Sequence, residues 1–181
     1  MRRTGLKGRL TRRQFTVGGA LASAAAMIGC RDSKRSSWES LSDAEARALA
    51  ALCNQIIPAD DFASASQAGA VNYIDRQLAR HYQKHESTYR EGLAALDDMS
   101  RRRFRILYAD ATADQQLELA FALEKESRAF FELVREHTME GYYGSPRHGG
   151  NRDAVSWRML GLDEPPLRGR AQYDLRKGTG A

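Results

Sequence analysis

Cysteine is scarce in this sequence, and its scarcity excludes two kinds of structure. The 181 residues contain only two cysteines, Cys30 and Cys53. They lie 23 positions apart, so the chain has no Cys-x-x-Cys-His heme-attachment motif and too few thiols for a disulfide framework. Cys53 falls on the apolar side of a predicted helix, where a thiol packs as a small hydrophobic group.

Nucleotide-binding motifs and strand patterns are also absent from the sequence. No Gly-x-Gly-x-x-Gly follows a strand pattern, so a dinucleotide-binding fold has no support. No two neighbouring segments alternate apolar and polar residues as the strands of a hairpin do. The sequence therefore predicts neither a β-sheet nor a cofactor bound by this chain.

Long apolar runs are missing as well, and one shorter stretch lies near the N-terminus. It covers Phe15–Ile28, 14 residues, whereas a membrane-spanning helix needs roughly 20. Residues 1–29 contain six Lys and Arg residues and no acidic residue. A basic segment followed by a short apolar one is typical of a cleaved secretory signal peptide.

The basic segment ends in Thr11-Arg12-Arg13-Gln14-Phe15, which resembles the twin-arginine export motif. In that motif the paired arginines, here Arg12 and Arg13, are recognised by the Tat export machinery, which carries folded proteins. The Gly- and Ala-rich apolar stretch also fits this route. We therefore expect residues 1–29 to be a twin-arginine signal peptide and the mature protein to be periplasmic. An ordinary secretory signal is the alternative.

Met27-Ile28-Gly29-Cys30 resembles a bacterial lipobox. In a lipobox the cysteine thiol receives a diacylglycerol and becomes the first residue of a membrane-anchored lipoprotein. Gly29 fits this pattern, whereas Met27 stands where leucine is usual. The alternative is cleavage after one of the alanines between residues 22 and 26, which leaves Cys30 as an ordinary thiol.

The formal net charge of +5 arises from the signal segment rather than from the folded part. Without residues 1–29, the chain keeps 22 Lys and Arg residues against 23 Asp and Glu residues, a net charge of −1. Nucleic-acid binding needs a basic excess in the folded part, so the composition gives it no support.

The chain after the signal divides into a tether, one helical domain and a tail. Residues 30–40 are polar and rich in serine, as a tether is. Residues 41–163 are long enough for one domain with its own core. Residues 164–181 have little apolar content, so we expect this tail to be mobile.

Apolar residues recur at helical spacing through most of the domain, which predicts an all-α fold of five or six helices. The first helix begins at the capping box Ser42-Asp43-Ala44-Glu45 and ends before Pro58. Further helices are predicted over Gln67–Tyr82, Lys84–Met99, Ser127–Tyr142 and Val155–Leu160, and in a segment that opens at Thr112 and contains Leu117, Ala120, Phe121 and Glu124. Arg101-Arg102-Arg103 is expected to be a solvated basic turn or, alternatively, a docking patch for an acidic partner. Phe104–Tyr108 fits either a strand or a helix.

Residues 137–153 are the segment richest in chemically active side chains. Gly149-Gly150 permits close approaches of the backbone, and Asn151 is suited to cap the following helix. The segment is interpreted either as a structured loop between helices or as a surface for a partner or ligand. In a separate alternative, four of its side chains form a small hydrolytic or metal site in a free-standing enzyme. These four are His137, Glu140, His148 and Asp153.

The same segment carries a family resemblance. Its pattern is His137-Thr138-Met139-Glu140-Gly141-Tyr142-Tyr143, then Pro146, Gly149-Gly150-Asn151-Arg152, Trp157 and Gly161. The N-terminal half adds Ile57-Pro58-Ala59-Asp60-Asp61, Ala68-Gly69-Ala70-Val71 and Tyr73-Ile74-Asp75-Arg76-Gln77-Leu78. Together these motifs resemble the gluconate 2-dehydrogenase subunit 3 family over about residues 41–162. The lipobox and the run of arginines at 101–103 depart from the family pattern.

The resemblance implies a non-catalytic small subunit of a membrane-associated dehydrogenase complex. In such complexes an FAD-containing subunit of the glucose–methanol–choline class oxidises a sugar or sugar acid, and a cytochrome c subunit with heme c accepts the electrons. The small subunit supports co-export and maturation of the flavin subunit. On this hypothesis, the loop Gly141–Arg152 forms part of the contact with the partner. The candidate contact residues are Tyr142, Tyr143, Pro146, Gly149, Gly150, Asn151, Arg152 and Trp157. A free-standing scaffolding lipoprotein is the remaining alternative.

Overall fold

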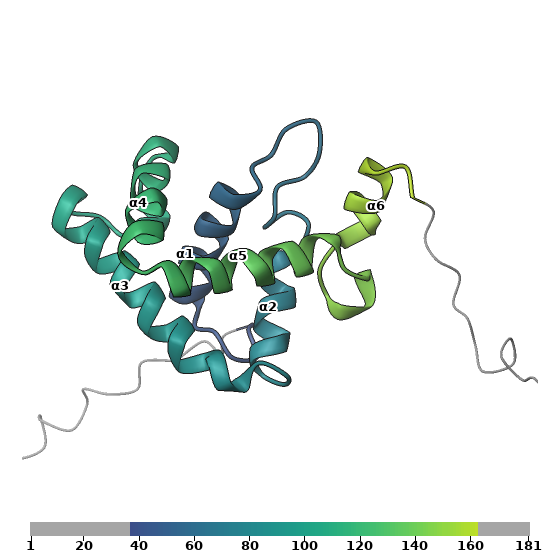
Figure 1. The fold of residues 1–181 in the computed structure, drawn as a ribbon, viewed down its shortest axis with the longest axis horizontal. Helices are drawn as coiled ribbons and strands as arrows, with labels where there is room; N and C mark the ends of the chain where they lie inside the picture. Colours follow the sequence, from purple (N-terminus) through teal and green to yellow (C-terminus); the bar gives the residue numbers. More distant parts are fainter. Residues whose placement is uncertain (1–36, 163–181) are drawn as a thin grey trace, which may run out of the picture. The chain divides into compact units, whose positions relative to one another are not determined.

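A computed structural model of the protein describes residues 37–162, and every regular element in this range is a helix (Figure 1). The α-helices are α1 (Asp43–Ile56), α2 (Ala70–Leu78), α3 (Glu86–Phe104), α4 (Ala113–Glu126), α5 (Arg128–Tyr143) and α6 (Val155–Met159). Short 3-10 turns η1 (Gln83–His85), η2 (Tyr108–Asp110), η3 (Pro146–His148) and η4 (Arg152–Ala154) connect them. The predicted all-α class is therefore confirmed.

Several predicted features fall outside the described range. They are the signal peptide over residues 1–29 with Arg12 and Arg13, the lipidation site Cys30, and the tail over residues 164–181. Within residues 37–162, no helix combines the length and the apolar composition that crossing a bilayer requires.

Two capping boxes set where α1 and α4 begin. Before α1, the Ser42 hydroxyl accepts from the Glu45 backbone N–H at 3.3 Å, and the Glu45 carboxylate accepts from the Ser42 N–H at 2.8 Å. Thr112 and Gln115 repeat this exchange before α4. Both helix starts match the sequence prediction, because a capping box is a purely local signal.

Two other predicted boundaries are wrong. Helix α2 does not begin at Gln67, because Gly69 adopts a left-handed backbone with φ of 87° immediately before Ala70. The arginines at positions 101–103 do not form a turn, because α3 continues to Phe104 and ends where Arg105 becomes left-handed with φ of 64°. Basic side chains stabilise the last turn of a helix through its dipole, so the charge run extends the helix.

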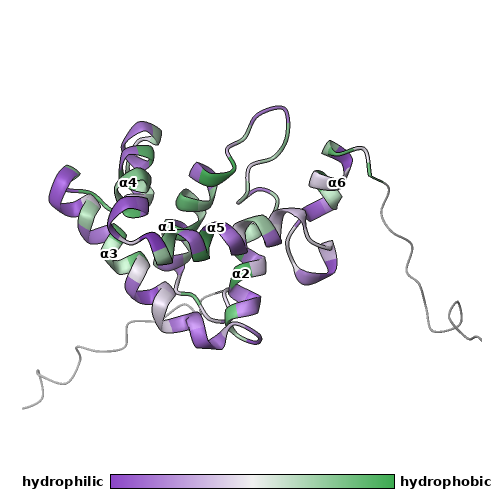
Figure 2. Ribbon diagram, viewed as in Figure 1, coloured by the Kyte–Doolittle hydropathy of each residue, from purple (hydrophilic) through white to green (hydrophobic). Residues whose placement is uncertain are grey.

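The core lies where α1, α2, α3, α4 and α5 pack together, and α5 runs across the domain from α4 towards α6 (Figure 1). Figure 2 shows hydrophobic residues along α1 and hydrophilic residues at the C-terminal end of α3. Cys53 on α1 is fully buried, with its Sγ 3.2 Å from Thr138 Oγ1 on α5. Burial raises the pKa of the Cys53 thiol to about 12, so it packs as a neutral core group, as predicted.

The buried carboxylate of Asp75 fixes the segment that leads into α1. Its two oxygens accept the backbone N–H groups of Glu39, Ser40 and Leu41 at 2.8, 2.9 and 2.9 Å. The side chain of Asp75 sits on α2, and the residue is only 2 % exposed. Trp38 is partly buried against the core. The last residues of the predicted tether therefore lie on the domain.

Candidate partner-binding surface

Asn151 organises the loop between α5 and α6. Its backbone N–H donates to the Gly141 carbonyl at 2.8 Å, and its Nδ2 donates to the Gly144 carbonyl at 2.8 Å. Its Oδ1 accepts from the backbone N–H of Ser156 in the first turn of α6 at 3.0 Å. The residue at the N-cap position of α6 is Ala154, but the Asn151 side chain satisfies a first-turn N–H of that helix, and one fully buried amide joins α5, the loop and α6.

The paired glycines bring the loop into direct backbone contact with its surroundings. A Cβ atom on Gly150 would lie 2.0 Å from the carbonyl oxygen of Gly141. The Gly149 carbonyl accepts from Asn72 Nδ2 of α2 at 2.6 Å. Arg152 donates its N–H to the Ala68 carbonyl at 2.8 Å. The predicted close approach is confirmed, and it ties the loop to α2.

The candidate contact residues divide by their burial. Tyr142 is buried and its hydroxyl donates to the Ala63 carbonyl at 2.9 Å, while Gly150 and Asn151 are also buried. Exposed or half-buried positions are Tyr143, Pro146, Gly149, Arg152 and Trp157. Trp157 Nε1 donates to the Tyr143 carbonyl at 2.9 Å, which places these two aromatic residues side by side. Tyr143 and Trp157 are therefore the two aromatic candidates that remain at least partly exposed.

His137 and Glu140 lie one turn apart on α5 in a hydrogen-bonded aromatic cluster. The hydroxyl of Tyr89 and Nδ1 of His137 are 2.9 Å apart in a hydrogen bond, and the Tyr82 ring stacks on His137 with centroids 4.2 Å apart. Tyr82 and Tyr73 donate their hydroxyls to Glu140 Oε2 at 2.8 and 3.2 Å. The cluster therefore connects α2, α3 and α5.

The electrostatics of this cluster favour uncharged rings around one carboxylate. Burial raises the pKa of Tyr89 and also raises that of Tyr82, so both phenols remain protonated donors. Burial lowers the pKa of His137, and the nearby charge of Glu140 opposes that shift. A neutral imidazole and protonated phenols form a structural network.

The alternative site of His137, Glu140, His148 and Asp153 is not assembled. His148 belongs to η3 and Asp153 to η4, and both are exposed. Across residues 37–162, no three His, Cys, Asp or Glu side chains come close enough together to hold a metal ion. The metal version of this alternative is therefore contradicted for the described part of the chain.

The neutral state of His137 predicts a pH dependence of stability. Because its pKa is lowered in the folded protein, the unfolded chain takes up a proton first as the pH falls below about 6.5. The contribution of neutral His137 to the free energy of unfolding is therefore fully present above this pH and declines below it. Between pH 7.5 and 5.5 we expect the wild type to lose more unfolding free energy than His137→Gln in urea denaturation. Equal losses in the two proteins would contradict this role of His137.

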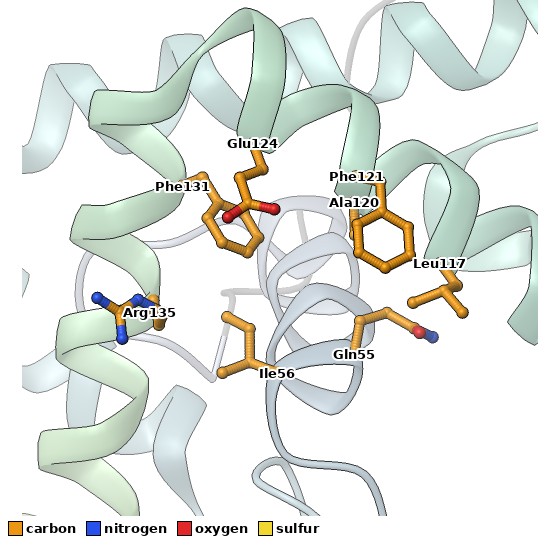
Figure 3. Close-up of a pocket in the computed structure, with 8 residues that line it drawn as sticks. All are labelled: Gln55, Ile56, Leu117, Ala120, Phe121, Glu124, Phe131 and Arg135. Carbon is orange, nitrogen blue, oxygen red and sulfur yellow. The ribbon is translucent and has the colours of Figure 1, made fainter.

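A second surface feature lies where α4 faces α1 and α5, and it was missed by the sequence analysis. The buried residues of α4 are Leu119, Ala120 and Leu123, whereas Leu117 and Phe121 are 41 % and 62 % exposed. These two side chains line a groove of about 250 Å³ (Figure 3). The remaining lining residues are Gln55 and Ile56 of α1, Ala120 and Glu124 of α4, and Phe131 and Arg135 of α5. The sequence signal that could have indicated this groove is the presence of apolar residues on two faces of α4.

The described residues thus form a helical domain with some apolar side chains exposed at its surface. A family model for gluconate 2-dehydrogenase subunit 3 matches residues 43–163, nearly all of the folded domain. The chain therefore belongs to the gluconate 2-dehydrogenase subunit 3 family, whose name denotes one subunit of a dehydrogenase complex. Neither curated proteins nor solved structures gave a match.

Proposed function

We propose that this chain is a non-catalytic subunit that exports and stabilises an FAD-containing dehydrogenase subunit in the periplasm. The observation that carries the proposal is the family match over residues 43–163, which spans the whole helical domain. The twin-arginine motif at Arg12 and Arg13 supports it, because this route transports folded proteins and so permits a bound partner to travel along.

The same proposal includes a place for the complex at the membrane. A diacylglycerol on Cys30 would hold the complex at a membrane surface, and the lipobox-like residues Met27–Gly29 support this anchor. The flavin subunit would oxidise a sugar or sugar acid, and a cytochrome c subunit would pass the electrons to the respiratory chain. The chain itself supplies binding surface to this assembly.

Replacing Arg12 and Arg13 by lysine tests the export role. We expect the double variant to lose most of the dehydrogenase activity in the periplasm, because the export receptor reads the arginine pair and the partner depends on this signal. The measurement is flavin-subunit activity in periplasmic and cytoplasmic fractions.

The matched control replaces Arg2 and Arg3 by lysine, since this pair lies in the same basic segment but outside the motif. The control is expected to export normally. Full periplasmic dehydrogenase activity while the Arg12 and Arg13 variant stays in the cytoplasm would refute co-export.

A further inference from the structure

Helix α4 has two apolar faces, of which only one serves the core. Leu119 and Leu123 point inward and are buried, whereas Leu117 and Phe121 lie one turn apart on the outer face. A helix on the surface of a single domain needs only one apolar stripe. A second stripe next to a groove marks an interaction surface, because burying it removes apolar area from water.

The groove beside this stripe is large enough to hold one side chain of a partner protein. Figure 3 shows Leu117 and Phe121 of α4, Ile56 of α1 and Phe131 of α5 around one space. Its volume of about 250 Å³ is below the roughly 300–1,000 Å³ of pockets for small organic ligands. Central, largely apolar pockets of this kind receive the anchor side chains of protein partners.

The charges at the rim favour a basic neighbour for that anchor. Arg135 is paired with Glu132 of its own helix, with Nε 2.9 Å from Oε2. Glu124 forms no ion pair with any side chain in residues 37–162. The groove therefore presents one uncompensated carboxylate beside an apolar socket, and a Lys or Arg on the partner would complement it.

Resting on the proposed function, we infer that this groove is the principal docking site for the flavin catalytic subunit. A helix or loop of that subunit places an aliphatic or aromatic side chain between Ile56, Phe121 and Phe131. A Lys or Arg close to this anchor faces Glu124. The surface around Tyr143 and Trp157 then adds contacts without carrying most of the affinity.

Alanine substitutions in the groove test this assignment. The tagged mature chain is immobilised, the purified flavin subunit is the analyte, and Kd and the dissociation rate are measured. Phe121→Ala is expected to raise Kd at least about ten-fold, chiefly through faster dissociation. Phe62→Ala is the matched control, because Phe62 is exposed but lies outside the groove, and it should change Kd less than about two-fold.

The rim charge has its own test. Glu124→Gln is expected to raise Kd several-fold at low ionic strength, and the difference should shrink at high salt because salt screens the pair. Glu126→Gln on the same helix is the control, since Glu126 does not line this groove. A Glu124→Gln effect independent of salt would overturn the basic complement.

The outcomes separate the docking site from the proposed function. If the wild type binds the flavin subunit and Phe121→Ala binds it equally well, the groove is not the docking site and the accessory function stands. If the wild type does not bind the flavin subunit, the proposed function fails. If Phe121→Ala leaves Kd unchanged and converts a dimer of this chain into a monomer by light scattering, a second copy occupies the groove. Circular dichroism checks that each variant remains folded.

Discussion

Replacing Gly150 by alanine is expected to lower the free energy of unfolding by at least about 3 kcal/mol. The added Cβ would lie 2.0 Å from the Gly141 carbonyl oxygen, which is main chain and cannot rotate away. That carbonyl also accepts the Asn151 N–H at 2.8 Å, so relieving the clash breaks the hydrogen bond that closes the loop. The measurement is urea denaturation, with a Tm expected to be about 6–12 °C lower.

Gly161→Ala is the control for this prediction. Gly161 has a left-handed φ of 66°, but no neighbouring atom lies within 4 Å of its added Cβ. The control therefore reports only the backbone cost of a side chain at positive φ, about 1–2 kcal/mol. A smaller loss for Gly150→Ala than for Gly161→Ala would contradict the described loop geometry.

Replacing Asp75 by alanine should remove the anchor of the segment before α1. The three backbone N–H groups of Glu39, Ser40 and Leu41 lose their common acceptor. A hydrogen bond to a charged group contributes about 1.5–3 kcal/mol, and the released segment regains contact with water. We therefore expect a net loss of about 3 kcal/mol in the free energy of unfolding.

Hydrogen exchange distinguishes this local release from general destabilisation. In Asp75→Ala the amides of residues 39–41 should exchange much faster than in the wild type. The exchange rate of the core amides of α1 should change only as far as the free energy of global unfolding changes. Asp61→Asn is the control, because Asp61 is an exposed loop carboxylate. Unchanged protection at residues 39–41 in Asp75→Ala would refute the anchor.

Local signals in the sequence were sufficient for helix starts and for the type of fold. Ser42 with Glu45, and Thr112 with Gln115, predict the observed caps because both partners lie within four residues. Helix boundaries that depend on the backbone conformation of a single residue were harder to predict from the sequence. The left-handed backbone of Gly69 shortens α2 at its start, and nothing in the periodicity of the apolar residues reveals that conformation.

Contacts between distant segments account for what the sequence could not provide. Gly149-Gly150 and Asn151 stood out as loop residues. However, the Gly141 and Gly144 carbonyls that accept from Asn151, and the closeness of Gly150 to Gly141, become visible only in the folded chain. The role of Asp75 is likewise not visible in the sequence, because its hydrogen-bond partners lie more than 30 positions earlier. The groove likewise combines three helices, so the spacing of its residues along the chain does not reveal it.

The central claim is that this chain acts by binding a flavoprotein that it helps to export. The most direct measurement is the flavin content of the tagged chain, expressed with its signal peptide and purified in mature form from the periplasm of cells that co-express the flavin subunit. Our account predicts stoichiometric flavin and dehydrogenase activity in the purified complex. Recovery of the chain without flavin, from a periplasm that contains the active flavin subunit, would contradict it.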